Sequence, residues 1–123
     1  MSLTSENIIT GVPKCNISLS LPKGVCVDVV PVDDEYLVAR VYGFHDKFRG
    51  NLYDESTEYL GIPFKMWAAQ HNVDIHSING TEDLQSARIF PLMRDVNSLM
   101  KVVSWMTGNC EDKEALALWN SVE

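Results

Sequence analysis

Two neighbouring stretches in the first third of the chain alternate between apolar and other residues with a period of two. In Val25–Val32, valines at alternate positions share one face, and Tyr36–Tyr42 repeats the pattern. Such alternation is typical of half-buried β-strands. The polar residues Asp33–Glu35 between them suit a turn, so the two strands are predicted to pair as an antiparallel hairpin. Cys15–Leu21 is a third strand candidate.

The second half of the chain changes to helical spacing. Asp95–Thr107 carries apolar residues three and four positions apart, with Asp95 as its predicted N-cap and Gly108 as its predicted stop. Shorter helices are predicted to open at Pro63 and at about Asp112. Strands first and helices afterwards indicate an α+β fold, with N-terminal antiparallel strands followed by three helices.

The length of 123 residues suits a single domain over 1–123. Residues 1–13 are expected to combine an added start, Met1–Leu3, with a short extended piece. The size and composition of that piece fit the last coil of a left-handed β-helix, although one coil cannot bury its own face. Residues 14–123 are then the α+β domain proper. The segment His45–Glu58 between strands and helices is predicted to be a polar loop.

The charge balance limits the partners. Ten Lys plus Arg against seventeen Asp plus Glu give a net charge of −7, which argues against nucleic acid and against an anionic membrane surface. No stretch approaches the roughly 20 apolar residues that span a bilayer, and no signal-peptide pattern is visible, so a cytoplasmic location is expected.

The cysteines and histidines show no metal-ligand spacing, and no metal site is predicted. Cys26 lies between valines and is predicted to be a buried, reduced thiol. The seven glycines are scattered singly, and no GxGxxG, GxxxxGK[ST], GxSxG or HExxH motif occurs. We therefore assign no catalytic residue.

The segment from Arg40 to Gly50 is the densest polar group in the chain. Its Asp46, Lys47 and Arg49 have two interpretations. They could recognise an anionic or hydroxylated ligand, because arginine suits phosphate and aspartate accepts bonds from sugar hydroxyls. Alternatively, they form a solvated loop with local ion pairs that contribute about 0–1 kcal/mol each. Arg40 and these three residues are our candidates for ligand or interface contacts.

Two further residues are candidates for such contacts. Arg88 lies between apolar residues in a short extended run, so its charge must be paired, reach solvent or bind a ligand. Trp105 lies off the main apolar stripe of its helix and is the better candidate for a contact surface. Trp67 and Trp119 lie on apolar stripes, which favours core packing.

An ordered set of segments resembles the GDP-fucose pyrophosphorylase family, which includes fucose-1-phosphate guanylyltransferase and bifunctional enzymes with an added L-fucokinase domain. The matching segments cover most of the chain: Asn7–Val12, Leu21–Val25, Arg40–Asp46, Leu60–Pro63 and Ala87–Pro91. The resemblance implies a parent enzyme of the salvage route that joins fucose-1-phosphate to GMP from GTP with Mg²⁺. In bifunctional members a kinase, using ATP, first phosphorylates L-fucose.

Within such a parent, the chain resembles a region that follows the nucleotidyl transferase domain. The glycine-rich phosphate loops that the parent needs do not occur here, so we expect an accessory domain that is inactive alone and carries no cofactor itself. Its expected partners are the neighbouring domains of the parent enzyme and fucose-1-phosphate. Two alternatives remain open: a stand-alone sugar-binding module and a non-catalytic assembly module.

Overall fold

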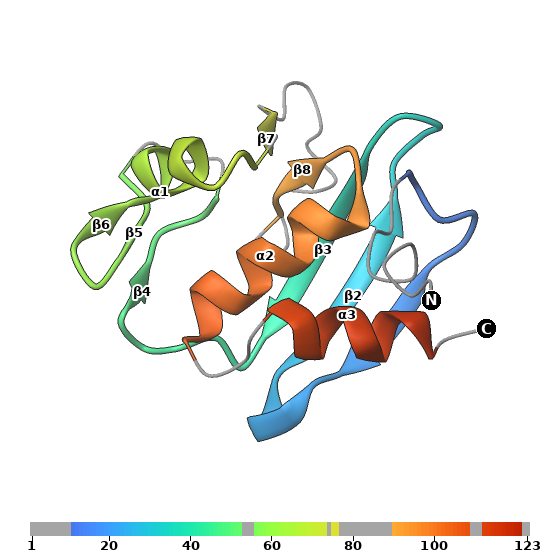
Figure 1. Cartoon of the computed structure of the whole chain (residues 1–123), viewed down its shortest axis with the longest axis horizontal. Coiled ribbons are helices and arrows are strands. Elements are labelled where there is room, and N and C mark those ends of the chain that lie inside the picture. Colours follow the sequence, from blue (N-terminus) through green and yellow to red (C-terminus); the bar gives the residue numbers. More distant parts are fainter. Residues whose placement is uncertain (1–10, 53–55, 74, 77–89, 109–111, 122–123) are drawn as a thin grey trace, which may run out of the picture.

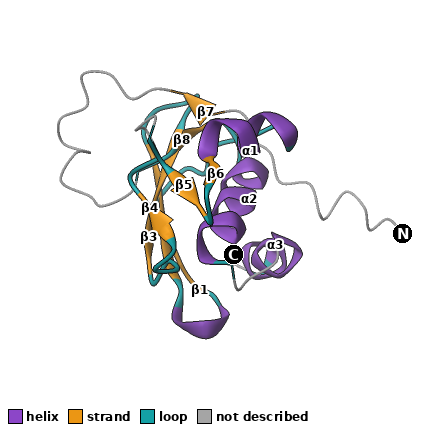
Figure 2. Cartoon of the chain, turned by 90° about the vertical axis from the view of Figure 1, so that its left-hand side faces the viewer, coloured by secondary structure: helices purple, strands orange, loops and turns teal. Residues whose placement is uncertain are grey.

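A computed structural model describes residues 11–52, 56–73, 75–76, 90–108 and 112–121. The larger sheet forms one layer, and the α-helices lie on one side of it (Figure 2). The elements, in chain order, are β1 (Ile17–Ser20), a short 3-10 turn η2 (Pro22–Gly24), β2 (Cys26–Pro31), β3 (Leu37–Tyr42), β4 (Phe48–Arg49), β5 (Glu58–Tyr59), β6 (Ile62–Pro63), α1 (Phe64–Gln70), β7 (Ile75–His76), β8 (Leu92–Met93), α2 (Val96–Thr107) and α3 (Asp112–Asn120).

The main sheet has five antiparallel strands in the order β1-β2-β3-β8-β7. The predicted hairpin is confirmed as β2 and β3, in the register that sets Val27 opposite Val41 and Asp28 opposite Arg40. Its turn is fixed by Asp33, whose Oδ1 accepts the backbone N–H groups of Glu35 at 2.7 Å and Tyr36 at 3.0 Å. The Asp33 carboxylate thus accepts hydrogen bonds from backbone N–H groups of its own turn, which stabilises the turn.

The core lies between this sheet and α2, which runs across its face with α3 beside it (Figure 1). The alternating apolar residues of β2 and β3 supply the sheet side, as the period-two pattern predicts. Fully buried side chains from both sides are Val27, Val29, Leu37, Ala39, Val41, Leu99, Met100, Val103 and Met106. The α+β class with three helices is therefore confirmed.

The ends of α2 follow the predicted signals. Asp95 is the N-cap, and its Oδ1 accepts the backbone N–H of Ser98 at 2.7 Å. Such a cap satisfies one of the amide donors that a helix leaves unpaired at its start. The helix ends at Gly108, which adopts a left-handed conformation with φ 65° and donates its N–H to the Ser104 carbonyl at 3.0 Å.

The second sheet was not predicted. Strands β4, β5 and β6 form a three-stranded antiparallel sheet, and β4 and the first residue of β5 fall inside the segment His45–Glu58 that we expected to be a loop. Each strand has only two residues, which is too short for alternation to become visible in the sequence.

The predicted burial of Cys26 is wrong, because its thiol is exposed. Its neighbours Val25 and Val27 point into the core, so Cys26 points to the opposite face of the sheet. Residues 1–10, which hold most of the expected β-helix coil, lie outside the described residues, as do Arg88 and Cys110. In the described part of the chain, no helix is long and apolar enough to cross a membrane.

Candidate functional site

The candidate segment Arg40–Gly50 connects the two sheets. It begins in β3, passes through the loop Gly43–Lys47, which we call the β3–β4 loop, and ends just after β4. The chain leaves the main sheet at Gly43, where φ is 81° and a Cβ atom would lie 2.6 Å from the carbonyl oxygen of Gly24. A side chain cannot be accommodated so close to backbone, so this turn requires glycine.

Three hydrogen bonds hold the β3–β4 loop. The backbone N–H of His45 donates to the Met106 carbonyl of α2 at 3.3 Å, and the N–H of Phe48 donates to the His45 carbonyl at 3.0 Å. The N–H of Lys47 donates to Nδ1 of His45 at 3.0 Å. The loop backbone is therefore anchored to α2 and closed on itself, whereas the side chains of Asp46, Lys47 and Arg49 are exposed.

His45 Nδ1 also lies 3.1 Å from Oδ1 of Asp46, whose side chain is 92% exposed. The two contacts need different protonation states. Neutral His45 with an unprotonated Nδ1 accepts the Lys47 N–H, whereas a protonated Nδ1 donates to the Asp46 carboxylate. One imidazole nitrogen thus lies within hydrogen-bonding distance of both the Lys47 N–H and the carboxylate that we proposed as a hydroxyl acceptor, and it bonds one of them at a time.

A cluster of aromatic rings lies beneath the loop, centred on Trp105. Its ring centroid is 5.5 Å from Phe48, 5.8 Å from Tyr59, 5.1 Å from Phe64 and 5.1 Å from Trp67. Trp105 is only 8% exposed, so within this chain its ring packs in the aromatic cluster, and its role as a contact residue stays a prediction. The side of α2 that lies off its main stripe is buried too, because β4, β5 and α1 cover it.

The indole Nε1 of Trp105 is buried and has no hydrogen-bond partner among the described residues. A buried donor without a partner costs free energy, so the surrounding rings must offset it. Trp67, predicted to belong to the core, is partly buried and stacks on Phe64 and on His71. The aromatic cluster gives the loop a rigid base.

Arg40 lies on the face of the main sheet opposite the helices, where it is partly buried. Its NH1 group donates to the hydroxyl of Tyr42 at 3.2 Å, and its guanidinium lies 5.6 Å from the centre of the Phe90 ring. The hydrogen bond to Tyr42 is the largest cause that raises the pKa of Arg40 above its ordinary value, and the charge of Asp28 adds to it. Arg40 is thus held as a cation on the sheet.

The structure does not bring all the candidates together. Arg40 belongs to the five-stranded sheet and Arg49 to the three-stranded sheet. No hydrogen bond or ion pair in the described part of the chain joins Arg40 to Asp46, Lys47 or Arg49. The β3–β4 loop with Arg49 is therefore one site, and Arg40 belongs to another surface. The proposed ligand roles of these residues stay predictions.

Sequence reasoning missed the polar row around Arg40. Asp28 pairs with Arg40 in the ladder, and on its other side it accepts a hydrogen bond from the Ser18 hydroxyl at 2.9 Å. The signal that could have found the row is the hairpin register. Once the turn at Asp33–Glu35 is placed, opposite residues across the hairpin follow directly.

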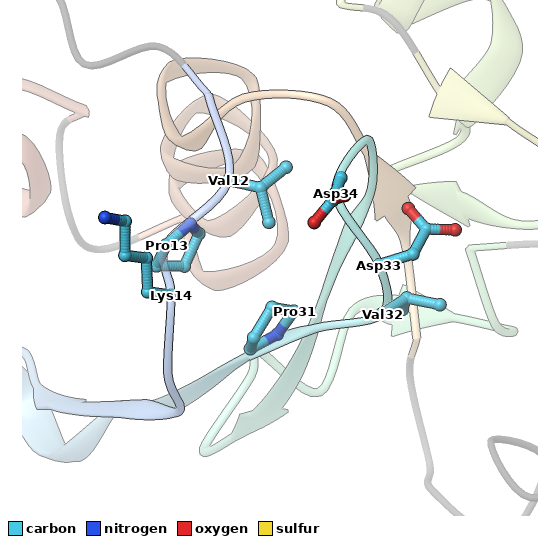
Figure 3. A pocket seen from close by; sticks show the side chains of 7 residues that line it. All are labelled: Val12, Pro13, Lys14, Pro31, Val32, Asp33 and Asp34. Carbon is cyan, nitrogen blue, oxygen red and sulfur yellow. The ribbon is translucent and has the colours of Figure 1, made fainter.

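A separate hollow of about 530 Å³ lies between the segment before β1 and the turn that joins β2 to β3 (Figure 3). Its lining residues are Val12, Pro13, Lys14, Pro31, Val32, Asp33 and Asp34. None of the site candidates that the structure describes lines this hollow. Among the described residues, no group of three or more His, Cys, Asp or Glu side chains could hold a metal ion.

Comparison with known proteins relates the chain to one kind of enzyme. It is 42% identical over 118 residues to an L-fucokinase/L-fucose-1-P guanylyltransferase of Bacteroides fragilis. The match covers 95% of this chain and 12% of that protein. No family model matches the chain, and no solved structure matches it. The resemblance seen in the sequence is thereby confirmed: the chain is similar to a segment that makes up 12% of that L-fucokinase/L-fucose-1-P guanylyltransferase.

Proposed function

We propose that the chain is an accessory domain of an enzyme that makes GDP-L-fucose from fucose-1-phosphate, and that its β3–β4 loop forms one wall of the sugar-phosphate site. One observation carries the proposal. The loop and the adjoining β4 display Asp46, Lys47 and Arg49 as exposed side chains on a backbone that is anchored to α2 and rests on the aromatic cluster. The similarity to the B. fragilis enzyme supports the class of substrate.

The chemistry of the three side chains fits a sugar phosphate. The Arg49 guanidinium and the Lys47 ammonium suit phosphate oxygens, and the Asp46 carboxylate accepts hydrogen bonds from sugar hydroxyls. On an open surface these contacts are weak, since water competes for each of them. When a second domain excludes water, the same charges interact more strongly. We therefore expect the loop to bind fucose-1-phosphate only in the longer protein.

The nucleotide, its Mg²⁺ and the transfer chemistry are assigned to the rest of the enzyme. Nucleotide phosphates are usually held by backbone N–H groups of a glycine-rich loop at a helix start, and the glycines of this chain are single and scattered. The acidic residues described here form no group suited to a metal ion. The proposed contribution of the chain is substrate positioning and packing against neighbouring domains. We also propose a cytoplasmic location, where GTP is available.

The test places this chain in the B. fragilis enzyme, in place of the matching segment. Lys47→Gln and Arg49→Gln are each expected to raise KM for fucose-1-phosphate about tenfold with little change in kcat, because each removes a charge-assisted contact to bound substrate. Lys14→Gln, an exposed lysine at the separate hollow, is the matched control and leaves KM unchanged. An unchanged KM in both loop variants contradicts the assignment of the wall.

A second measurement tests the accessory role. The purified chain is mixed with GTP, Mg²⁺ and fucose-1-phosphate, and pyrophosphate release is recorded. We expect none, and calorimetry is expected to detect no binding of fucose-1-phosphate tighter than millimolar. Guanylyl transfer by the chain alone would overturn the accessory role, and submillimolar affinity would show that the site needs no second domain.

A further inference from the structure

The elements β5, β6 and α1 lie together at one end of the molecule (Figure 1), and three apolar side chains of this part are exposed. Leu60 is 58% exposed, Ile62 42% and Met66 53%. They fall within one short stretch of sequence, in the β5–β6 turn, in β6 and in α1. Only two other large apolar side chains in the described part of the chain, Val32 and Tyr42, are comparably exposed. Single exposed apolar residues are ordinary, but three of them close in sequence, on elements that contact one another, indicate a contact surface.

The backbone at Leu60 makes this residue unusual. Its φ is 54°, and the following Gly61 has φ 79°. Two positive φ values in a two-residue hairpin turn favour Asn, Asp or Gly at the first position, since a side chain with Cβ is disfavoured there. Leu60 is thus both strained and exposed in the folded chain. Strain of this kind is retained where the residue serves a contact.

We infer that Leu60, Ile62 and Met66 form a docking surface for another segment of the same longer polypeptide; the inference rests on the proposed accessory function. In the B. fragilis relative, the match covers only 12% of the protein, so most of that polypeptide is available to cover the surface. Three side chains cannot supply the roughly 800 Å² per partner that a stable complex of separate proteins buries. A covalently linked neighbour can bind through a smaller buried area, because the linkage raises its effective concentration to about millimolar.

The charge of the chain also argues against a second copy as the occupant. Each copy has a net charge of −7, and repulsion between like charges weakens association through a small patch. A neighbouring domain of the same polypeptide is attached already and meets no such concentration limit. The docking surface therefore faces the rest of the enzyme rather than a second copy of this chain.

The experiment compares the isolated chain with the B. fragilis enzyme that carries it, by hydrogen exchange of α1 and of the β5–β6 turn. We expect at least tenfold slower exchange of these amides in the enzyme. The variant Leu60→Asn, Ile62→Thr, Met66→Gln is expected to lose that difference. In the isolated chain it is expected to be as stable as the parent or more so, because asparagine suits the turn. Val32→Thr, 40% exposed at the other turn, is the control and retains the difference.

Equal exchange in the isolated chain and in the enzyme, or protection that survives the triple substitution, would overturn the inference. Concentration-dependent dimerisation of the isolated chain that the triple variant abolishes would also overturn it, because the occupant is then a second copy. Activity separates this result from the proposed function. An active enzyme with an unprotected surface refutes only the docking surface, whereas unchanged KM in the Lys47 and Arg49 variants refutes only the substrate wall.

If the hybrid enzyme does not assemble, the comparison is made with separate components. The chain is mixed with B. fragilis protein that lacks the matching segment, and binding is followed by sedimentation. We expect the parent chain and the Val32→Thr control to bind alike and the triple variant to bind at least tenfold more weakly. Equal binding by all three chains, or binding by none, would contradict the docking surface.

Discussion

The hydroxyl of Tyr59 lies directly against Gly108, so the three-stranded sheet meets α2 at the residue where that helix ends. A Cβ atom at position 108 would overlap the hydroxyl and would lie 2.9 Å from Cζ of the same ring. The Tyr59 ring cannot easily move aside, because it packs edge-on against His45 and Trp105. Gly108 therefore serves both as a left-handed helix end and as the space for a buried tyrosine.

This contact predicts a large effect of Gly108→Ala. The left-handed conformation costs about 1–2 kcal/mol for a residue with Cβ, and the overlap with Tyr59 adds about 1–3 kcal/mol. Gly24→Ala is the matched control, because Gly24 has φ 85° and a Cβ atom there would meet no other atom within 4 Å. Urea unfolding should show a loss of about 1–2 kcal/mol for Gly24→Ala and a clearly larger loss for Gly108→Ala. Equal losses would show that the Tyr59 ring moves aside and makes room for the added Cβ atom.

Trp105 provides a second prediction, since it is the centre of the aromatic cluster. Trp105→Ala is expected to lower the free energy of unfolding by about 3–5 kcal/mol, as for a large ring removed from a core. Trp105→Phe should cost less than about 2 kcal/mol, because it also removes the buried Nε1 donor, which carries a penalty of about 1–3 kcal/mol. Thermal or urea unfolding measures both. A loss below about 0.5 kcal/mol for Trp105→Ala would indicate a surface residue instead.

The pair Arg40–Tyr42 predicts an effect that does not depend on pH. The hydrogen bond to Tyr42 raises the pKa of Arg40 in the folded chain above its unfolded value. A raised pKa contributes stability at every pH below the unfolded value, and this stability is lost only in strong alkali. Because Tyr42 is exposed, Tyr42→Phe should lower the free energy of unfolding by less than about 1 kcal/mol. This loss should be the same from about pH 5 to pH 8. Urea unfolding across this range checks it, and a cost that varies with pH would implicate another group.

The sequence predicts the long, regular elements well, because their patterns repeat. The hairpin of β2 and β3 has enough residues for alternation to show, and Asp95 marks the start of α2 by a capping preference that acts locally. The burial of Trp105 could not be predicted from a local pattern. Its burial depends on Phe48 and Tyr59, which come from two-residue strands far away in the chain.

For the candidate site too, the sequence predicts the local features and not the arrangement in space. The polar character of the β3–β4 loop follows directly from its residue types. That Arg40 lies on one sheet and Arg49 on another does not, because it depends on where the chain leaves the main sheet at Gly43. The bond from Lys47 N–H to His45 Nδ1, which closes the loop, likewise depends on a local geometry that residue types do not determine.

That bond predicts different behaviour for two substitutions of His45. In His45→Asn the side-chain oxygen takes the place of Nδ1 as acceptor, whereas His45→Phe keeps a ring against Tyr59 and loses the acceptor. Since a hydrogen bond contributes about 0.5–1.5 kcal/mol, we expect exchange of the Lys47 amide to accelerate about two- to tenfold in His45→Phe. In His45→Asn the rate should stay near that of the parent, as measured by NMR.

The same pair tests the link between loop order and substrate binding. In the B. fragilis enzyme carrying this chain, His45→Phe should raise KM for fucose-1-phosphate, because Lys47 is then held less firmly, and His45→Asn should leave it nearly unchanged. If both variants raise KM equally, the imidazole itself contacts the substrate. If neither variant raises KM, the order of the β3–β4 loop does not affect substrate binding. A contact between Lys47 and the substrate then requires a loop conformation other than the one held by His45.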